Sequence, residues 1–287
     1  MSSPVILDLD ASVGSLEGGL VIPLLDWQEL VRFGCGMRAM QRLSETLNSR
    51  LPDRHGTVFL GSGDFHHLSY LLIERMAGRG PFEVVVFDNH PDNMRFPFGI
   101  HCGSWVRRVA LLPFVSHVHV VGITSADVSW SHSWENYLRP LLSGKLTYWC
   151  IDVDTRWAAL LGLSKSILSF ASPAELMGAF IQHLDDTETA TYLSIDKDVL
   201  SPDVVRTNWD QGQLTDKDLF LAIDRLSGRL VGSDITGEIS AYEYKTAWKR
   251  WLSGLDGQSS VSGDALAEWQ HRQHELNRRL MARLQAA

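Results

Sequence analysis

Short apolar runs rich in β-branched residues recur along the chain and alternate with segments of helical periodicity. The runs cover residues 5–9, 57–60, 83–87, 118–123, 146–151, 191–195 and 230–235. Runs without polar alternation are typical of parallel strands that helices cover on both faces. The pattern therefore predicts an α/β fold, a three-layer αβα sandwich around a mostly parallel, doubly wound sheet.

The segments between these runs carry apolar residues near helical spacing. We expect helices over residues 26–47, 67–76, 173–184 and 219–226. Pro173 after Ser172 is typical of a capped helix start. A chain of 287 residues can fold as one large α/β domain, so we predict a single catalytic domain over residues 1–255.

The last part of the chain has a different composition. Residues 254–263 are rich in Gly and Ser, and residues 264–285 carry an apolar stripe at helical spacing. We therefore predict a linker and a C-terminal helix over residues 256–287. The helix could pack on its own domain or form a subunit contact.

Composition excludes several classes of function. A formal charge of −8 does not favour a nucleic-acid-binding surface. No run approaches the roughly 20 apolar residues that cross a bilayer, so no membrane partner is expected. The three cysteines make no disulfide framework, and the first residues do not resemble a signal peptide. We therefore expect a cytoplasmic protein.

Polar residues gather just after the predicted strands. Asp88, His90 and Asp92 stand two apart after one run, and would project to one face if the strand continued. Asp196 and Asp198 repeat this spacing after another run, with the intervening lysine directed away. Active sites of open α/β sheets lie beyond the carboxyl ends of the strands.

A single Asp-x-Asp pair is a weak signal, because such pairs also occur in ordinary loops. Asp152 and Asp154 follow a strand in the same way, and we expect them to have no metal. Two clusters with histidines are stronger, because four nearby carboxylates repel one another and two divalent cations offset their charge. Carboxylate and imidazole ligands suit manganese or a similar ion. A hydroxide that bridges two such ions is a strong nucleophile at neutral pH.

At this point the motifs resemble those of the ureohydrolases: arginase, agmatinase and formiminoglutamase. Residues 88–92 resemble the family's Asp-Ala-His-x-Asp, and residues 194–202 resemble its Ser-x-Asp-x-Asp-x-x-Asp-Pro. The resemblance implies an arginase-like fold and two Mn²⁺ ions, with another divalent metal possible. It also implies a set of ligands: Asp88 and Asp196 bridging the metals, Asp92 completing one metal, and His90 and Asp198 completing the other.

Three further stretches carry the same resemblance less closely. Residues 63–70 resemble Gly-Gly-Asp-His-Ser-x-Ser-Tyr, which makes His66 a metal ligand and leaves His67 open. His101 resembles a histidine that shuttles protons, a role that its ordinary pKa near 6.5 suits, although it could be a loop residue without a role. Glu238 resembles the glutamate that holds the substrate guanidinium, but it falls one residue late and could be structural. Asp234 is expected either to support the site or to be a structural group.

The resemblance implies a hydrolase of a linear C–N bond in a small cationic guanidino or amidino compound. The metal-bridging hydroxide would attack, and Asp92 would pass its proton to the leaving amine. A homo-oligomer is also expected. Ser201 replaces the motif's last aspartate, and residues 206–214 replace its Gly-Thr-Pro segment, so the substrate stays open. The alternatives are a single-zinc deacetylase on the related fold and a non-catalytic arginase-like protein.

Overall fold

The computed structural model describes residues 3–250 and 263–287. These residues form a nine-stranded sheet in the order β2-β1-β4-β11-β10-β5-β7-β8-β9, and all of its strand pairs are parallel. Its strands are β1 (Val5–Asp8), β2 (Leu20–Pro23), β4 (Val58–Gly61), β5 (Phe82–Phe87), β7 (Val115–Ile123), β8 (Leu146–Ile151), β9 (Ile167–Phe170), β10 (Thr191–Asp196) and β11 (Leu230–Thr236). The predicted parallel sheet is confirmed. The two strands that the sequence did not predict, β2 and β9, are the edges.

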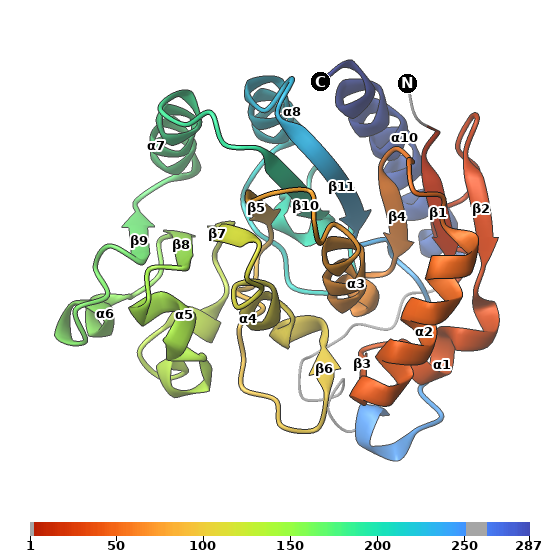
Figure 1. Cartoon of the computed structure of the whole chain (residues 1–287), viewed down its shortest axis with the longest axis horizontal. Helices are drawn as coiled ribbons and strands as arrows, with labels where there is room; N and C mark the ends of the chain where they lie inside the picture. Colours follow the sequence, from red (N-terminus) through yellow and green to blue (C-terminus); the bar gives the residue numbers. More distant parts are fainter. Residues whose placement is uncertain (1–2, 251–262) are drawn as a thin grey trace.

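Helices cover both faces of the sheet (Figure 1). They are α1 (Gln28–Val31), α2 (Met37–Arg50), α3 (Ser69–Glu74), α4 (Val106–Val109), α5 (Leu138–Leu142), α6 (Arg156–Leu160), α7 (Pro173–Asp185), α8 (Asp216–Arg225) and α10 (Gly263–Ala286). A short antiparallel pair, β3 (Gly34–Cys35) with β6 (Ile100–His101), lies outside the main sheet. The predicted start of α7 is confirmed, because the Ser172 hydroxyl accepts a hydrogen bond from the Glu175 amide and Pro173 follows it.

Successive residues of each strand enter different cores. In β5, Val84 and Val86 pack with α2, α3 and α4, whereas Val85 and Phe87 pack with α7, α8 and α10. Both sets are fully buried, which is why the strand carries no polar alternation. The predicted three-layer αβα sandwich is therefore confirmed.

Two predicted helices are interrupted. The helix expected over 26–47 is broken by Phe33, whose φ of +65° is in the left-handed region, and by the β3 pair that follows it. The helix expected over 67–76 begins instead as a 3-10 helix, η2 (Gly63–Leu68), which continues into α3. Apolar spacing could not reveal either break, because the residues on both sides remain buried.

The C-terminal helix α10 packs on its own domain. Leu276 and Leu280 join the core formed by α7 and α8. Most of the predicted linker, residues 254–262, lies outside the described residues. No helix in the described ranges combines the length and apolar character that a membrane span requires.

Candidate metal centre

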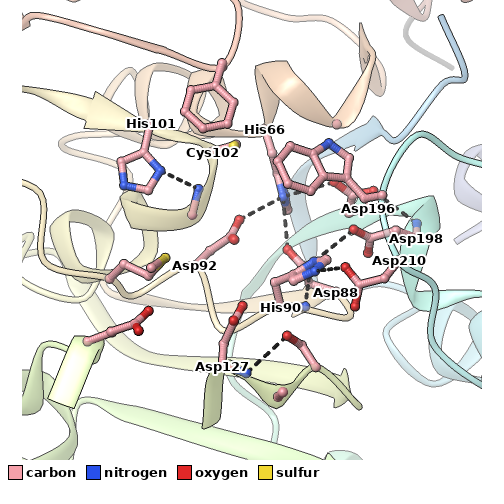
Figure 2. A pocket seen from close by; sticks show the side chains of 18 of the residues that line it. His66, Asp88, His90, Asp92, His101, Cys102, Asp127, Asp196, Asp198 and Asp210 are labelled. Atoms are coloured by element: carbon pink, nitrogen blue, oxygen red, sulfur yellow. Dashed lines mark hydrogen bonds and ion pairs between the residues drawn. The ribbon is translucent and has the colours of Figure 1, made fainter. Parts of the chain in front are cut away.

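Two neighbouring strands carry the predicted carboxylates to one edge of the sheet. Residue Ile195 of β10 pairs with Phe87 of β5, so Asp196 and Asp88 leave the sheet side by side. His66 reaches the same place from η2, which follows β4. Figure 2 shows these side chains directed toward one another. The cavity that they line has a volume of about 660 Å³.

The first group of possible ligands is His66, Asp88 and Asp196. Nδ1 of His66 lies 3.1 Å from Asp88 Oδ2 and 3.4 Å from Asp196 Oδ2. Asp92 Oδ2 is 3.2 Å from the same nitrogen. The sequence left a choice between the two histidines. It is His66 that lies among the carboxylates, whereas His67 is buried and does not line the cavity.

The second group is Asp88, His90 and Asp198. Nδ1 of His90 lies 3.0 Å from Asp198 Oδ2 and 3.5 Å from Asp88 Oδ1. Asp88 thus directs one oxygen toward each group, as a ligand shared by two ions would. Asp196 belongs to the first group, and the bridging role that the resemblance gives it stays a prediction.

Loops and turns produce this geometry rather than continued strands. The strand β5 ends at Phe87, and Asp92 has a φ of +46°, so the expected strand alternation over 88–92 is wrong. Asp196 is the last residue of β10, and Asp198 lies in the 3-10 helix η6 (Lys197–Val199). The Asp196 side chain accepts a hydrogen bond from the Asp198 amide at 3.1 Å, which closes this turn.

Hydrogen bonds from the far side of each imidazole fix which nitrogen faces the carboxylates. Ser194 donates to Asp234, so its oxygen is available to accept from His66 Nε2 at 3.0 Å. His90 Nε2 donates to Asp210 Oδ1 at 2.7 Å. If a metal displaced the Nδ1 proton, both rings would direct an Nδ1 lone pair inward, which is the arrangement of metal-binding histidines. The supporting role predicted for Asp234 fits this geometry.

The carboxylates cannot easily all ionise in this buried cluster. Burial, reinforced by the Asp88 charge, raises the pKa of Asp92 to about 8 and that of Asp198 to about 6. Burial and the Asp198 charge raise the pKa of Asp196 as well. Burial also opposes ionisation of Asp88, but the adjacent His66 and His90 imidazoles outweigh it and hold the pKa of Asp88 below its ordinary value. If all four carboxylates were ionised, they would carry more negative charge than two protonated histidines could offset.

Divalent cations fit this donor set. His66 Nδ1 and Asp88 Oδ2 are buried without a directed hydrogen bond, although they lie 3.1 Å apart. Neighbouring ligands of an ion that binds at about 2.1 Å with right-angled geometry are also roughly 3 Å apart. Carboxylates with one imidazole in each group suit manganese and similar ions.

The two outer residues predicted from the resemblance have different positions. His101 lines the cavity, where burial lowers its pKa to about 3, below the ordinary value that suits a proton shuttle, and the shuttle role stays a prediction. Glu238 is buried outside the cavity lining, with Oε1 2.5 Å from Lys197 Nζ. This position supports the structural alternative for Glu238 and not its predicted substrate contact.

Other cavity residues were not predicted. Asp210 and Trp209 come from the loop after β10, and Phe33 comes from the break after α1. Asp127 and Glu135 add carboxylates to the lining, on the segment after β7. None follows a motif or a strand end at fixed spacing, although Trp209 and Asp210 lie in the loop where the sequence departs from the resemblance.

A third group, Glu83, His119 and His183, lies away from this cavity. The Trp149 indole donates to His119 Nδ1 at 3.2 Å, so neutral His119 carries its proton on Nε2. That nitrogen lies 3.2 Å from His183 Nε2 and can donate to it. The Nδ1 lone pair of His119 is therefore occupied by the Trp149 indole, and its Nε2 carries a proton, so neutral His119 has no lone pair free for a metal. This sets the third group apart from the first two.

Comparisons with known proteins agree with this fold. No family model matches the chain. A Thermotoga maritima protein described only as uncharacterized is 30% identical over 200 residues, and the match covers 69% of this chain and 63% of that protein. The chain thus spans less than two thirds of that relative's length.

Solved structures match over nearly the whole chain. The proclavaminate amidino hydrolase of Streptomyces clavuligerus has a TM-score of 0.58 at 14% identity, over 99% of this chain and 93% of that one. The agmatine ureohydrolase of Thermoplasma volcanium has a TM-score of 0.54 at 12% identity, over 99% of this chain and 90% of that one. The Trypanosoma cruzi formiminoglutamase with Mn²⁺ has a TM-score of 0.52 at 12% identity, over 98% of this chain and 93% of that one. The chain therefore has the ureohydrolase fold, as the motifs predicted.

Proposed function

We propose that the chain is a divergent ureohydrolase that uses two Mn²⁺ ions to hydrolyse a linear C–N bond in a guanidino or amidino compound. The observation that carries this proposal is the pair of ligand groups that share Asp88. A single-zinc deacetylase needs only one such group. The solved structures named above, two of them hydrolases by name and one with Mn²⁺, support the same class.

The residues divide into two metal positions. His66, Asp88, Asp92 and Asp196 would hold one ion, and Asp88, His90 and Asp198 would hold the other. When bound, the ions would neutralise the carboxylates and lower the pKa of water so that it attacks at neutral pH. The Ser194–Asp234 pair and Asp210 would keep the two imidazoles oriented.

Asp92 is the residue best placed to move a proton. The Trp105 indole donates to Asp92 Oδ2 at 2.6 Å and fixes the carboxylate beside His66. The pKa of Asp92, raised to about 8 by burial and Asp88, lies near neutrality, where a group can both accept and release a proton. Bound cations would lower this pKa. Asp92 would take a proton from the attacking water and give it to the nitrogen that leaves as the C–N bond breaks.

The cavity suits a small cation. Beyond the ligand groups, Asp127, Glu135 and Asp210 line it, and Phe33 and Trp209 stack with ring centroids 6.2 Å apart. Carboxylates attract a positive substrate, and aromatic faces stabilise guanidinium or ammonium groups. His101, neutral because burial lowers its pKa to about 3, would serve as a hydrogen-bonding group of the lining.

We also propose a cytoplasmic homo-oligomer. The support is the three free, buried cysteines and the resemblance to a family whose members usually assemble.

The test is an assay of the Mn²⁺-loaded protein on a panel of guanidino and amidino compounds, with released urea and ammonia as the readout. We expect turnover of at least one panel member, and none from Asp196→Asn under the same loading. Release of acetate from acetylated amines by a one-zinc protein, without urea or ammonia from the panel, would contradict the proposal.

A further inference from the structure

The C-terminal helix α10 buries two polar side chains as completely as its leucines. Gln273 and Asn277 are both 0% exposed, like Leu280. They are four residues apart, so they lie on one face of the helix, directed into the domain. Fully buried amides are uncommon unless each makes specific hydrogen bonds.

Gln273 binds the segment that follows β11. Its Nε2 donates to the Gly237 carbonyl at 2.8 Å and to the Arg206 carbonyl at 2.8 Å. Its Oε1 accepts from the Ile239 amide at 2.7 Å. One side chain thus fixes the backbone on both sides of Glu238.

Asn277 binds the ion pair beside this segment. Its Nδ2 donates to Glu238 Oε1 at 2.6 Å, and its Oδ1 accepts from Lys197 Nζ at 3.1 Å. Lys197 and Glu238 are themselves 2.5 Å apart, with side chains 0% and 2% exposed. Lys197, whose side chain the sequence predicted to point away from the site, is therefore fixed by contacts with Glu238 and with Asn277 of α10.

The segment held by Gln273 lies directly against a predicted metal ligand. Gly237 has a φ of +87°, and a Cβ atom there would lie 2.6 Å from the Lys197 amide nitrogen and closer still to Asp196 Oδ1. Thr236 also pairs with Asp196 across the β10–β11 ladder. Any shift of residues 237–239 would therefore displace the turn that carries Asp196 and Asp198.

We infer that Gln273 and Asn277 are positioning residues for the metal centre, so that metal affinity depends on contacts made by the C-terminal helix. The inference rests on the proposed metal site. Both amides act through Lys197 and Gly237, and neither lines the cavity. Groups that orient metal ligands typically change affinity by about 10- to 100-fold when they are removed.

The experiment compares Mn²⁺ binding by the full chain and three variants, well below their melting temperatures. Asn277→Leu and Gln273→Met remove the hydrogen bonds with little change in volume. Leu280→Ala is the control, because it removes buried packing from the same helix without touching the held segment. We expect Mn²⁺ binding weakened about 10- to 100-fold in the two amide variants and unchanged in the control.

The outcomes separate the two proposals. If the natural chain binds no Mn²⁺, the proposed function is wrong. If it binds Mn²⁺ and the amide variants bind equally well, the positioning role is wrong. Equal weakening in Leu280→Ala would also overturn it, because general loosening of α10 would then be sufficient. If Asn277→Leu does not fold, Gln273→Met gives the decisive value.

Discussion

Two Asp-x-Asp pairs follow two buried strands of the same sheet, yet their surroundings differ. Asp152 and Asp154 follow β8 and are exposed, and Asp154 forms an ion pair at 2.7 Å with Arg156, the first residue of α6. Asp196 ends β10 and Asp198 lies in η6 just after it. Both are buried, and they contact His66 and His90, which lie just after β4 and β5. The strand β10 lies between β11 and β5, whereas β8 lies beside the edge strand β9.

The difference indicates that the neighbours of an Asp-x-Asp pair, and not its spacing, decide whether the pair could bind a metal. The Arg156 hydrogen bonds lower the pKa of Asp154 to about 2, so it is ionised and already paired. Burial and Asp88 raise the pKa of Asp198 to about 6, so a nearby cation would favour its ionised form. An Asp-x-Asp pair is a candidate ligand pair where a central strand brings it against other carboxylates.

The largest expected effect comes from removing one ligand of the buried pair. Asp196→Asn should lower Mn²⁺ affinity by more than about 100-fold, beyond the loss typical of a supporting residue, and abolish turnover. Asp152→Asn should change neither. Elemental analysis and titration with Mn²⁺ measure both variants, and equal metal content in the two would break the comparison.

The next largest effect is expected from pH, because buried carboxylates of the metal centre bind protons near neutral pH, whereas Asp154 of the exposed pair is ionised there. The pKa of Asp92 is raised to about 8 and that of Asp198 to about 6, so at lower pH a metal must displace their protons. Affinity should therefore fall as pH drops below about 8, by roughly tenfold per unit for each displaced proton. Calorimetry in buffers of different ionisation enthalpy measures the protons released. A pH-independent affinity between 6 and about 8 would contradict this prediction.

A supporting residue should have a smaller effect. Asp210→Asn weakens the acceptor for His90 Nε2 and should reduce Mn²⁺ affinity by about 10- to 100-fold. Asp203→Asn, an exposed position in the same loop, is the matched control. If both variants bind Mn²⁺ as the natural chain does, Asp210 does not orient His90.

The smallest effect is expected at the exposed pair. Asp154→Ala removes only the bond to Arg156 on the surface, which water and salt screen. The melting temperature of the chain and its Mn²⁺ affinity should both stay unchanged. A clear fall in the melting temperature or in the Mn²⁺ affinity would mean that the segment around Asp154 supports the fold or the metal centre.

The sequence predicted the parts of the site that local patterns control. Apolar runs located the strands, and polar residues after β5 and β10 located Asp88 and Asp196 at one edge, since parallel strands end together. The sequence attributed the geometry of the predicted ligands to strand alternation, which was wrong. Asp92 has a left-handed backbone conformation, and Asp198 lies in a 3-10 helix. Such backbone details leave no clear pattern in the residues.

Residues brought by tertiary packing could not be predicted. Asp210 reaches His90 across a loop without regular spacing. Glu238 turns from the cavity to Lys197, and Asn277 of α10 completes that contact. Each of these contacts joins segments far apart in sequence, and its polar partner became visible only in the folded chain.

The central claim is that the buried pair belongs to a two-metal centre. The direct measurement is the number of metal ions per chain after reconstitution with Mn²⁺, determined by elemental analysis and by anomalous scattering from crystals. The two ligand groups that share Asp88 predict two ions per chain, one beside His66 and one beside His90. One ion per chain, or none at these residues, would contradict it.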